Sequence, residues 1–322
     1  MNSVKKVCRW LIPAAAAVML LLLLDAVLYP CTFMRIDIHA LSTNTFDDVF
    51  LGTSHGKMNI DPASMEEISG RTGHNACVGG EYPVDSYYLT KLMIDRGHAP
   101  KRIVYEISGD YMVRKKEEGN NYLLFYHEFP LGKTKLEYFA NCLLKCNFRT
   151  LLFPWYEYEL SYEIPRIAQT AAARFSGDYS TDGMKTAAQQ YHESGFIERF
   201  PVDTSSMTAE GTMSAPAADV LPENMEYLGK LIDLCKSEGI EFTAVTTPLP
   251  LPLLQAHVQD YQEMWAMFGD FFREKDVYWV NFNDQMYFNS FTHEMAAFTD
   301  MDGHMNGNAA RAFSRVLAQT LM

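Results

Sequence analysis

The feature that most constrains the fold is a series of short apolar segments that alternate with helical segments. The run Val49-Phe50-Leu51 is fully apolar and β-prone, which is typical of a strand buried on both faces. A second short strand is predicted near residues 74–80 and a third at 101–107, with helices at 63–69 and 83–96 between them. Strands and helices that alternate at this spacing predict a parallel sheet.

The same alternation returns in the last third of the chain. Strands are predicted at 241–246 and 277–282, with helices at 223–237, 258–273 and 308–321. Apolar residues make up 48% of the 322 residues, which is enough for a large core. We therefore predict an α/β fold, a three-layer α/β/α sandwich around a parallel central sheet.

A stretch at about 111–222 interrupts this pattern. Aromatic residues crowd the segment 122–162, and a second packed subcore is the favoured interpretation. A helical cap over the site and a surface that rests on a membrane are the alternatives. Residues 176–222 are polar and rich in Ser, Thr, Gly and Ala, which predicts long loops. The predicted organisation is one α/β domain at 46–322 that carries this insertion.

The N-terminus predicts a membrane anchor. Residues 10–28 are apolar except for Asp25, and as a helix they would reach about 28 Å, close to the hydrocarbon thickness of a bilayer. We expect 1–30 to form a cytoplasmic tip and one transmembrane signal anchor, and 31–45 a connector. A cleaved signal peptide is the alternative, because the uninterrupted apolar run, 11–24, is short.

Charge sets the orientation and the partners. Three basic residues, Lys5, Lys6 and Arg9, precede the apolar run, so we expect the N-terminus in the cytoplasm and the main domain outside the cell, on the cell membrane. The whole chain has a formal net charge of −13. Nucleic-acid binding requires a basic surface, so this composition argues against it.

Two distant segments place reactive side chains where a parallel sheet would bring them together. Ser54 directly follows the strand at 49–51, and ligands of open α/β sheets bind at the carboxyl ends of the strands. The loop before the last helix holds Asp300, Asp302 and His304. A serine nucleophile needs a base, and the base needs a carboxylate to hold its tautomer. The candidate catalytic residues are therefore Ser54, His304 and either Asp302 or Asp300.

Blander interpretations of the same residues stay open. The segment 52–56 is also an ordinary strand-to-helix turn, and it matches the G-x-S-x-G elbow of α/β-hydrolases, although that elbow normally follows several strands. His55 is interpreted as a structural or substrate-side group. Asp300, Asp302 and His304 could hold a divalent ion, but a fourth ligand is not evident, so we predict no metal and no cofactor.

Together these segments resemble the SGNH (GDSL-like) hydrolase superfamily, over roughly 46–110 and 240–322. The segment Gly52-Thr53-Ser54 is similar to the block that carries the nucleophile. The segment 75–81 is similar to the second block and implies Gly80 as an oxyanion donor. Asp110 stands where the third block has an Asn donor, and the Asp300 to His304 loop brackets the D-x-x-H of the last block without matching its spacing.

The anchor and the Ser-His pair look closer to a membrane-tethered branch of this superfamily. That branch includes the D-alanine transfer protein of teichoic acid modification and the alginate O-acetylation proteins. An Asp-x-His pair is used in the alginate group, and this resemblance favours Asp302 over Asp300 as the partner of His304.

The resemblance implies a membrane-anchored acyl esterase or acyltransferase that acts on acyl esters of cell-surface glycans. A carboxylate at Asp110 has no hydrogen to donate, and loss of one oxyanion donor typically costs about 100- to 1000-fold in rate. The alternative is therefore a weak or inactive SGNH-like accessory protein that binds a membrane O-acyltransferase or a glycan.

Overall fold

The computed structural model is built on one parallel sheet. It describes residues 2–28, 31–116, 124–146, 164–177, 179–181 and 183–322. Five strands run in the order β2-β1-β3-β6-β7, and every neighbouring pair is parallel. The strands are β1 (Asp48–Gly52), β2 (Gly73–Asn75), β3 (Arg102–Glu106), β6 (Glu241–Thr246) and β7 (Tyr278–Asn281).

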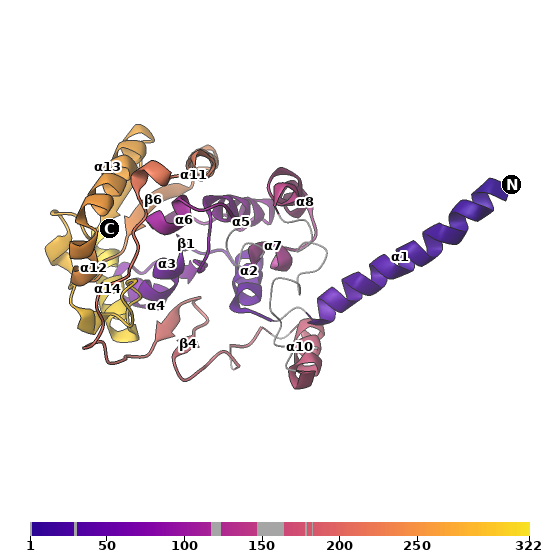
Figure 1. Cartoon of the computed structure of the whole chain (residues 1–322), viewed down its shortest axis with the longest axis horizontal. Coiled ribbons are helices and arrows are strands. Elements are labelled where there is room, and N and C mark those ends of the chain that lie inside the picture. The colour runs from indigo at the N-terminus through magenta and orange to yellow at the C-terminus, as the bar shows by residue number, and fades with distance from the viewer. Residues whose placement is uncertain (1, 29–30, 117–123, 147–163, 178, 182) are drawn as a thin grey trace.

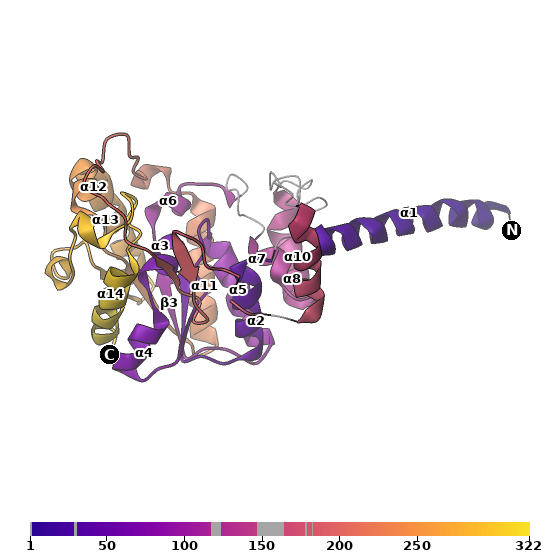
Figure 2. The same ribbon diagram turned by 90° about the horizontal axis from the view of Figure 1, so that it is seen from below.

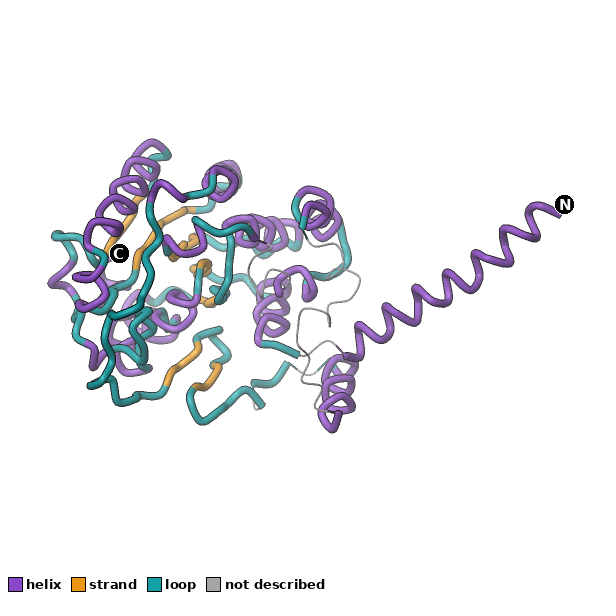
Figure 3. The backbone as a smooth tube through the Cα atoms, in the orientation of Figure 1, coloured by secondary structure: helices purple, strands orange, loops and turns teal. Residues whose placement is uncertain are grey.

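Helices cover both faces of this sheet (Figures 1 and 3). They are α3 (Ser54–Asn59), α4 (Pro62–Ser69), α5 (Pro83–Asp95), α6 (Gly109–Met112), α11 (Pro222–Ser237), α12 (Leu251–Ala256), α13 (Val258–Glu274) and α14 (Gly307–Thr320). The predicted helices and strands outside the insertion are thus present, most within two residues of their predicted ends, but β2 ends at Asn75, five residues before its predicted end.

Alternate residues of each strand enter different cores. Val49 and Leu51 of β1 pack into the core that α5, α11 and α13 complete, together with Ile103 of β3. Phe50 and Val104 point the other way, into the core formed with α4 and α14. Side chains of a strand alternate between its faces, and both faces here are covered, so the central residues of β1, Val49 to Leu51, are apolar on both faces. This is the predicted three-layer arrangement.

The segment 31–45, expected to be a connector, contains a helix that packs into the body. This helix, α2 (Phe33–Thr43), buries Met34, Ile38 and Leu41 in the same core as β1 and α5. The carboxylate of Asp37, fully buried on the same helix, bonds to groups of the sheet layer. The body of the protein therefore begins before residue 46.

The insertion is only partly within the described residues, which leave out 117–123 and 147–163 and with them 18 of the 41 residues of the aromatic segment. Its described elements are α7 (Leu124–Glu128), α8 (Lys133–Asn141), α10 (Ile164–Ser176) and a hairpin of β4 (Gln189–Tyr191) and β5 (Ile197–Arg199). Phe125, Phe129 and Tyr138 join the core that contains α5. The hairpin lies where long loops were predicted.

The N-terminal helix α1 (Asn2–Leu28) extends away from the body beside α10 (Figure 2). Its described side chains between Arg9 and Leu21 are exposed. Within the described residues, none of the helices meets the combination of length and apolar character that a membrane span requires.

Candidate active site

The turn that carries Ser54 depends on a glycine. β1 ends at Gly52, which has a φ of 131°, and a Cβ there would lie 2.2 Å from the backbone oxygen of Glu106. An L side chain is excluded by both the conformation and the contact. Thr53 then caps α3, because its Oγ1 accepts a hydrogen bond from the His55 N–H at 3.3 Å. Ser54 is the first residue of this helix and is half-buried.

Glu106 holds the same turn from the neighbouring strand. Its Oε2 accepts hydrogen bonds from the Thr53 N–H at 2.9 Å and from the Thr53 hydroxyl at 2.6 Å. The register of the sheet pairs Gly52 with Glu106, so the carboxylate lies directly beside the turn. Sequence reasoning did not identify Glu106, although an acidic residue at the end of a predicted neighbouring strand was a visible signal.

The loop that carries His304 is fixed from α3. Asn59 donates from Nδ2 to the Gly303 carbonyl at 3.0 Å and accepts from the Met305 N–H at 2.8 Å. Thr299 closes the loop, because its N–H donates to the His304 carbonyl at 2.8 Å. The helix of the candidate nucleophile thus also positions the candidate base.

These supports bring a hydroxyl, an imidazole and a carboxylate into one chain of hydrogen bonds. The Oγ of Ser54 lies 2.8 Å from the Nε2 of His304. The Nδ1 of His304 lies 2.9 Å from the Oδ2 of Asp300. A carboxylate accepts hydrogen bonds, so Nδ1 carries the proton and Nε2 is left to accept from Ser54. This is the order of contacts that a serine nucleophile requires.

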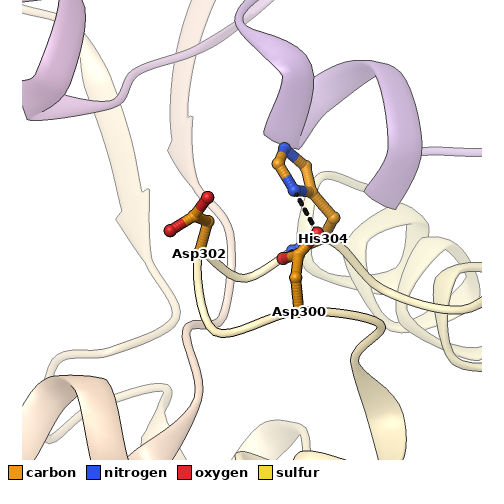
Figure 4. A group of neighbouring side chains, drawn as sticks. All are labelled: Asp300, Asp302 and His304. Carbon is orange, nitrogen blue, oxygen red and sulfur yellow. Dashed lines mark hydrogen bonds and ion pairs between the residues drawn. The ribbon is translucent and has the colours of Figure 1, made fainter. Parts of the chain in front are cut away.

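The carboxylate in this chain is Asp300, not Asp302, which the resemblance favoured. In Figure 4 the dashed line joins His304 to Asp300, whereas the Asp302 carboxylate lies apart. Gly303 has a φ of 104° and reverses the chain, which leaves the Asp302 side chain exposed. Asp300 also accepts a hydrogen bond from the backbone N–H of His304 at 3.1 Å. Its carboxylate therefore holds both the backbone nitrogen and the ring Nδ1 of His304, four residues further along the chain.

The environment keeps Asp300 ionised. Burial alone would raise the pKa of Asp300. Hydrogen bonds from His304, attraction to that imidazole and the charge of Arg199 outweigh burial and bring the pKa down to about 2. Arg199 donates from Nη1 to the Oδ2 of Asp300 at 2.7 Å. It comes from β5, inside the segment interpreted as loops, so the sequence carried no signal for this contact.

The glycines of the predicted oxyanion segment lie beside Ser54. A Cβ on Gly79 would be 3.6 Å from the Cβ of Ser54, so the Gly79 backbone lies beside the candidate nucleophile. Gly80 follows it with a φ of 84°. Burial raises the pKa of Tyr111, and a hydrogen bond from the Gly80 peptide N–H opposes part of that shift.

Asp110 lines a cavity next to the site. The cavity measures about 50 Å³ and is shared with His55 and Asp302, while Tyr261, Met264 and other apolar side chains form the rest of its wall. The side chain of Asp110 is exposed at this cavity. An ionised carboxylate here offers no hydrogen bond to a developing oxyanion.

The same three loop residues were the candidate metal ligands. Within the part of the chain that the structure describes, Asp300, Asp302 and His304 each place one ligand atom within 4.8 Å of the others. However, the Nδ1 of His304 is already hydrogen-bonded to Asp300, and the Arg199 guanidinium already forms an ion pair with the Asp300 carboxylate. An ion would have to displace both contacts, so the arrangement fits a hydrogen-bonded imidazole–carboxylate pair better than a metal centre.

Comparisons with known proteins do not assign this chain to a family. No family model matches the sequence, and no curated protein matches it. Solved structures do match, among them one described as a "putative lipolytic protein of G-D-S-L family from Desulfitobacterium hafniense DCB-2". That match has 8% identity and a TM-score of 0.41, and it covers 85% of this chain and 98% of the other. At this score and identity the likeness assigns no function to this chain.

Proposed function

We propose that this protein is a serine-dependent acyl esterase or acyltransferase with Ser54, His304 and Asp300 as its triad. One observation carries the proposal: the continuous hydrogen-bonded path from the Ser54 hydroxyl through both nitrogens of His304 to Asp300. The Ser54 and His304 side chains are both only half-buried, and the neighbouring residues His55 and Asp302 line a cavity.

The proposed reaction follows from the positions of the protons. The Oγ of Ser54 attacks the acyl carbonyl while its proton moves to the Nε2 of His304, and the imidazolium is stabilised by Asp300. Peptide N–H groups of the Ser54 turn stabilise the oxyanion, and the Gly80 N–H joins them by exchanging its hydrogen bond to Tyr111 for one to the oxyanion. The imidazolium returns its proton to the leaving alcohol, and water or an acceptor hydroxyl then cleaves the acyl-serine.

The substrate class and the location are part of this proposal. We propose acyl esters of cell-surface glycans, with the chain attached to the cell membrane through residues 1–30 and its main domain outside. The support is the basic tip before the apolar N-terminal run. A protease added to intact cells would then remove the domain and leave the N-terminal tip.

One observation favours a second candidate, a catalytically weak accessory protein that binds a glycan or a membrane O-acyltransferase. Asp110 stands at the cavity without a hydrogen to donate, where the resembling family has an Asn. If the Ser54→Ala variant restored the function of cells that lack this protein, the accessory role would hold.

The direct test compares turnover of short-chain aryl acetates by the wild-type full chain, Ser54→Ala and His304→Ala. We expect each variant to lose about 10⁴-fold or more in kcat, because triad members act as one unit. Equal turnover by all three proteins would exclude Ser54 chemistry.

A further inference from the structure

His55 contacts the loop that carries the base. Its Nε2 lies 2.7 Å from the carbonyl oxygen of Asp302, two residues before His304. A carbonyl only accepts hydrogen bonds, so this nitrogen must carry the proton. We infer that His55 is a positioning residue that holds His304 at its distance from Ser54, and this inference rests on the proposed function.

The Nε2 side of the His55 ring makes its one short side-chain hydrogen bond, and polar groups enclose the Nδ1 side at longer distances. Its Nδ1 lies 3.5 Å from the Thr53 hydroxyl and 4.0 Å from the Oε1 of Glu106. The residue is only 7% exposed, and it occupies the second position of α3, directly after Ser54. A ring held in this way acts as a rigid link between the nucleophile turn and the base loop.

Close packing around Gly303 restricts the turn that accepts this hydrogen bond. A Cβ on Gly303 would lie 3.6 Å from the Nε2 of His55 and 2.8 Å from a methyl carbon of Leu249. With a φ of 104°, Gly303 brings the Asp302 carbonyl onto the imidazole. The His55–Asp302 bond therefore fixes one side of the loop, and the Asn59–Gly303 bond fixes the other.

The two imidazoles also pack against each other. The rings of His55 and His304 lie 5.0 Å apart with an interplanar angle of 23°. Stacking limits rotation of the His304 ring about its side-chain bonds. His55 cannot itself act as base for Ser54 in this arrangement, because its Nε2 proton is directed at the Asp302 carbonyl.

The test uses a matched pair of variants in the full chain. His55→Phe keeps the ring and the stacking but removes the donor, whereas His55→Gln keeps a side-chain N–H donor without the ring. A displacement of about 1 Å at a catalytic group can cost about 100-fold. We expect His55→Phe to lower kcat for aryl acetates by about 10- to 100-fold, with KM within about twofold, and His55→Gln to stay within about fivefold of wild type.

Equal kcat in both variants and wild type would overturn the inference. So would a loss that appears mainly as a raised KM, because His55 would then touch substrate. If His55→Phe does not fold, His55→Asn replaces it, since the shorter amide cannot reach the Asp302 carbonyl.

A second readout separates this inference from the proposed function, because it needs no turnover. The His304 Nδ1 proton, hydrogen-bonded to Asp300, should give a low-field proton NMR signal in wild type and His55→Gln. It should broaden in His55→Phe. If the signal broadened only in His55→Phe but wild type had no activity, only the proposed function would be refuted. An unchanged signal in all three proteins would refute the positioning role.

Discussion

Helix α3 carries Ser54 at its first residue and Lys57 three residues later, and the two side chains enter different polar clusters. Ser54 meets His304, which is bonded to Asp300 at 2.9 Å. Lys57 donates to the Oδ2 of Asp37 at 2.7 Å. The Oδ1 of Asp37 accepts from the Nε2 of a second histidine, at position 74, at 2.8 Å.

The two clusters contain the same imidazole–carboxylate pair but differ in access. The side chains of His304 and Asp300 are 14% and 27% exposed, whereas those of His74 and Asp37 are 1% and 0% exposed. The Tyr191 hydroxyl donates to Asp37 as well, at 2.6 Å. An imidazole–carboxylate bond alone therefore does not identify a catalytic site. The cluster of His304 differs from that of His74 because the second ring nitrogen of His304 faces the half-buried Ser54 hydroxyl.

Replacing each aspartate with asparagine tests this difference most strongly at Asp300. Asp300→Asn leaves the shape intact but removes the charge and replaces one of the two acceptor oxygens that fix the His304 tautomer with a donor, so we expect kcat to fall by about 10³- to 10⁴-fold. Steady-state kinetics on an aryl acetate measure the loss. A loss of less than about 10-fold would show that His304 does not depend on Asp300.

Asp37→Asn should lower the stability of the protein and leave its activity nearly unchanged. Burial raises the pKa of Asp37, but attraction to Lys57 and hydrogen bonds from His74 and Lys57 outweigh it and lower the pKa overall. Removing this charge leaves Lys57 buried without its counter-charge, so we expect a loss of about 3–5 kcal/mol in the free energy of unfolding, measured by urea titration. The folded fraction should keep its kcat within about threefold. A stable but inactive variant would place Asp37 in the catalytic machinery instead.

Glu81 extends the comparison to a buried carboxylate whose partners are hydroxyls. Burial raises its pKa, hydrogen bonds from Ser86 and Tyr105 oppose part of the shift, and nearby carboxylates add to it, which gives a pKa of about 8. The folded state therefore keeps this proton up to about pH 8, while the unfolded chain loses it near 4.5. Folding takes up a proton within this interval, so stability should fall as pH rises, by at most about 1.4 kcal/mol per pH unit.

Glu81→Gln removes this dependence because an amide has no proton to lose. We expect its free energy of unfolding to change less than that of wild type between pH 5.5 and pH 7.5, as urea titrations at the two values would show. Parallel changes in both proteins would mean that Glu81 is ionised in the folded state.

Asp302→Asn is the matched control for Asp300→Asn, and it should have the smallest effect. The contact that Asp302 makes to His55 comes from its backbone carbonyl, which the substitution keeps. We expect kcat within about threefold of wild type. A loss as large as that of Asp300→Asn would restore Asp302 as the partner of His304.

The sequence predicted the parts of the site that depend on local pattern. Ser54 after a buried strand and His304 before the last helix could both be located, because strand ends of a parallel sheet share one edge. The residue pattern left Asp300 and Asp302 open and the resemblance favoured Asp302, because neither shows the positive φ of Gly303 that turns Asp302 away. Arg199 was missed because its hairpin is short and polar, and Asp37 because its partners are distant in sequence.

The central claim is that Ser54 is an activated nucleophile. A serine-directed phosphonate, incubated with the full chain and followed by peptide mass mapping, tests it most directly. We predict one adduct, on Ser54, that forms much more slowly in His304→Ala. Wild type that stays unlabelled, or that is labelled on another serine, would contradict the account.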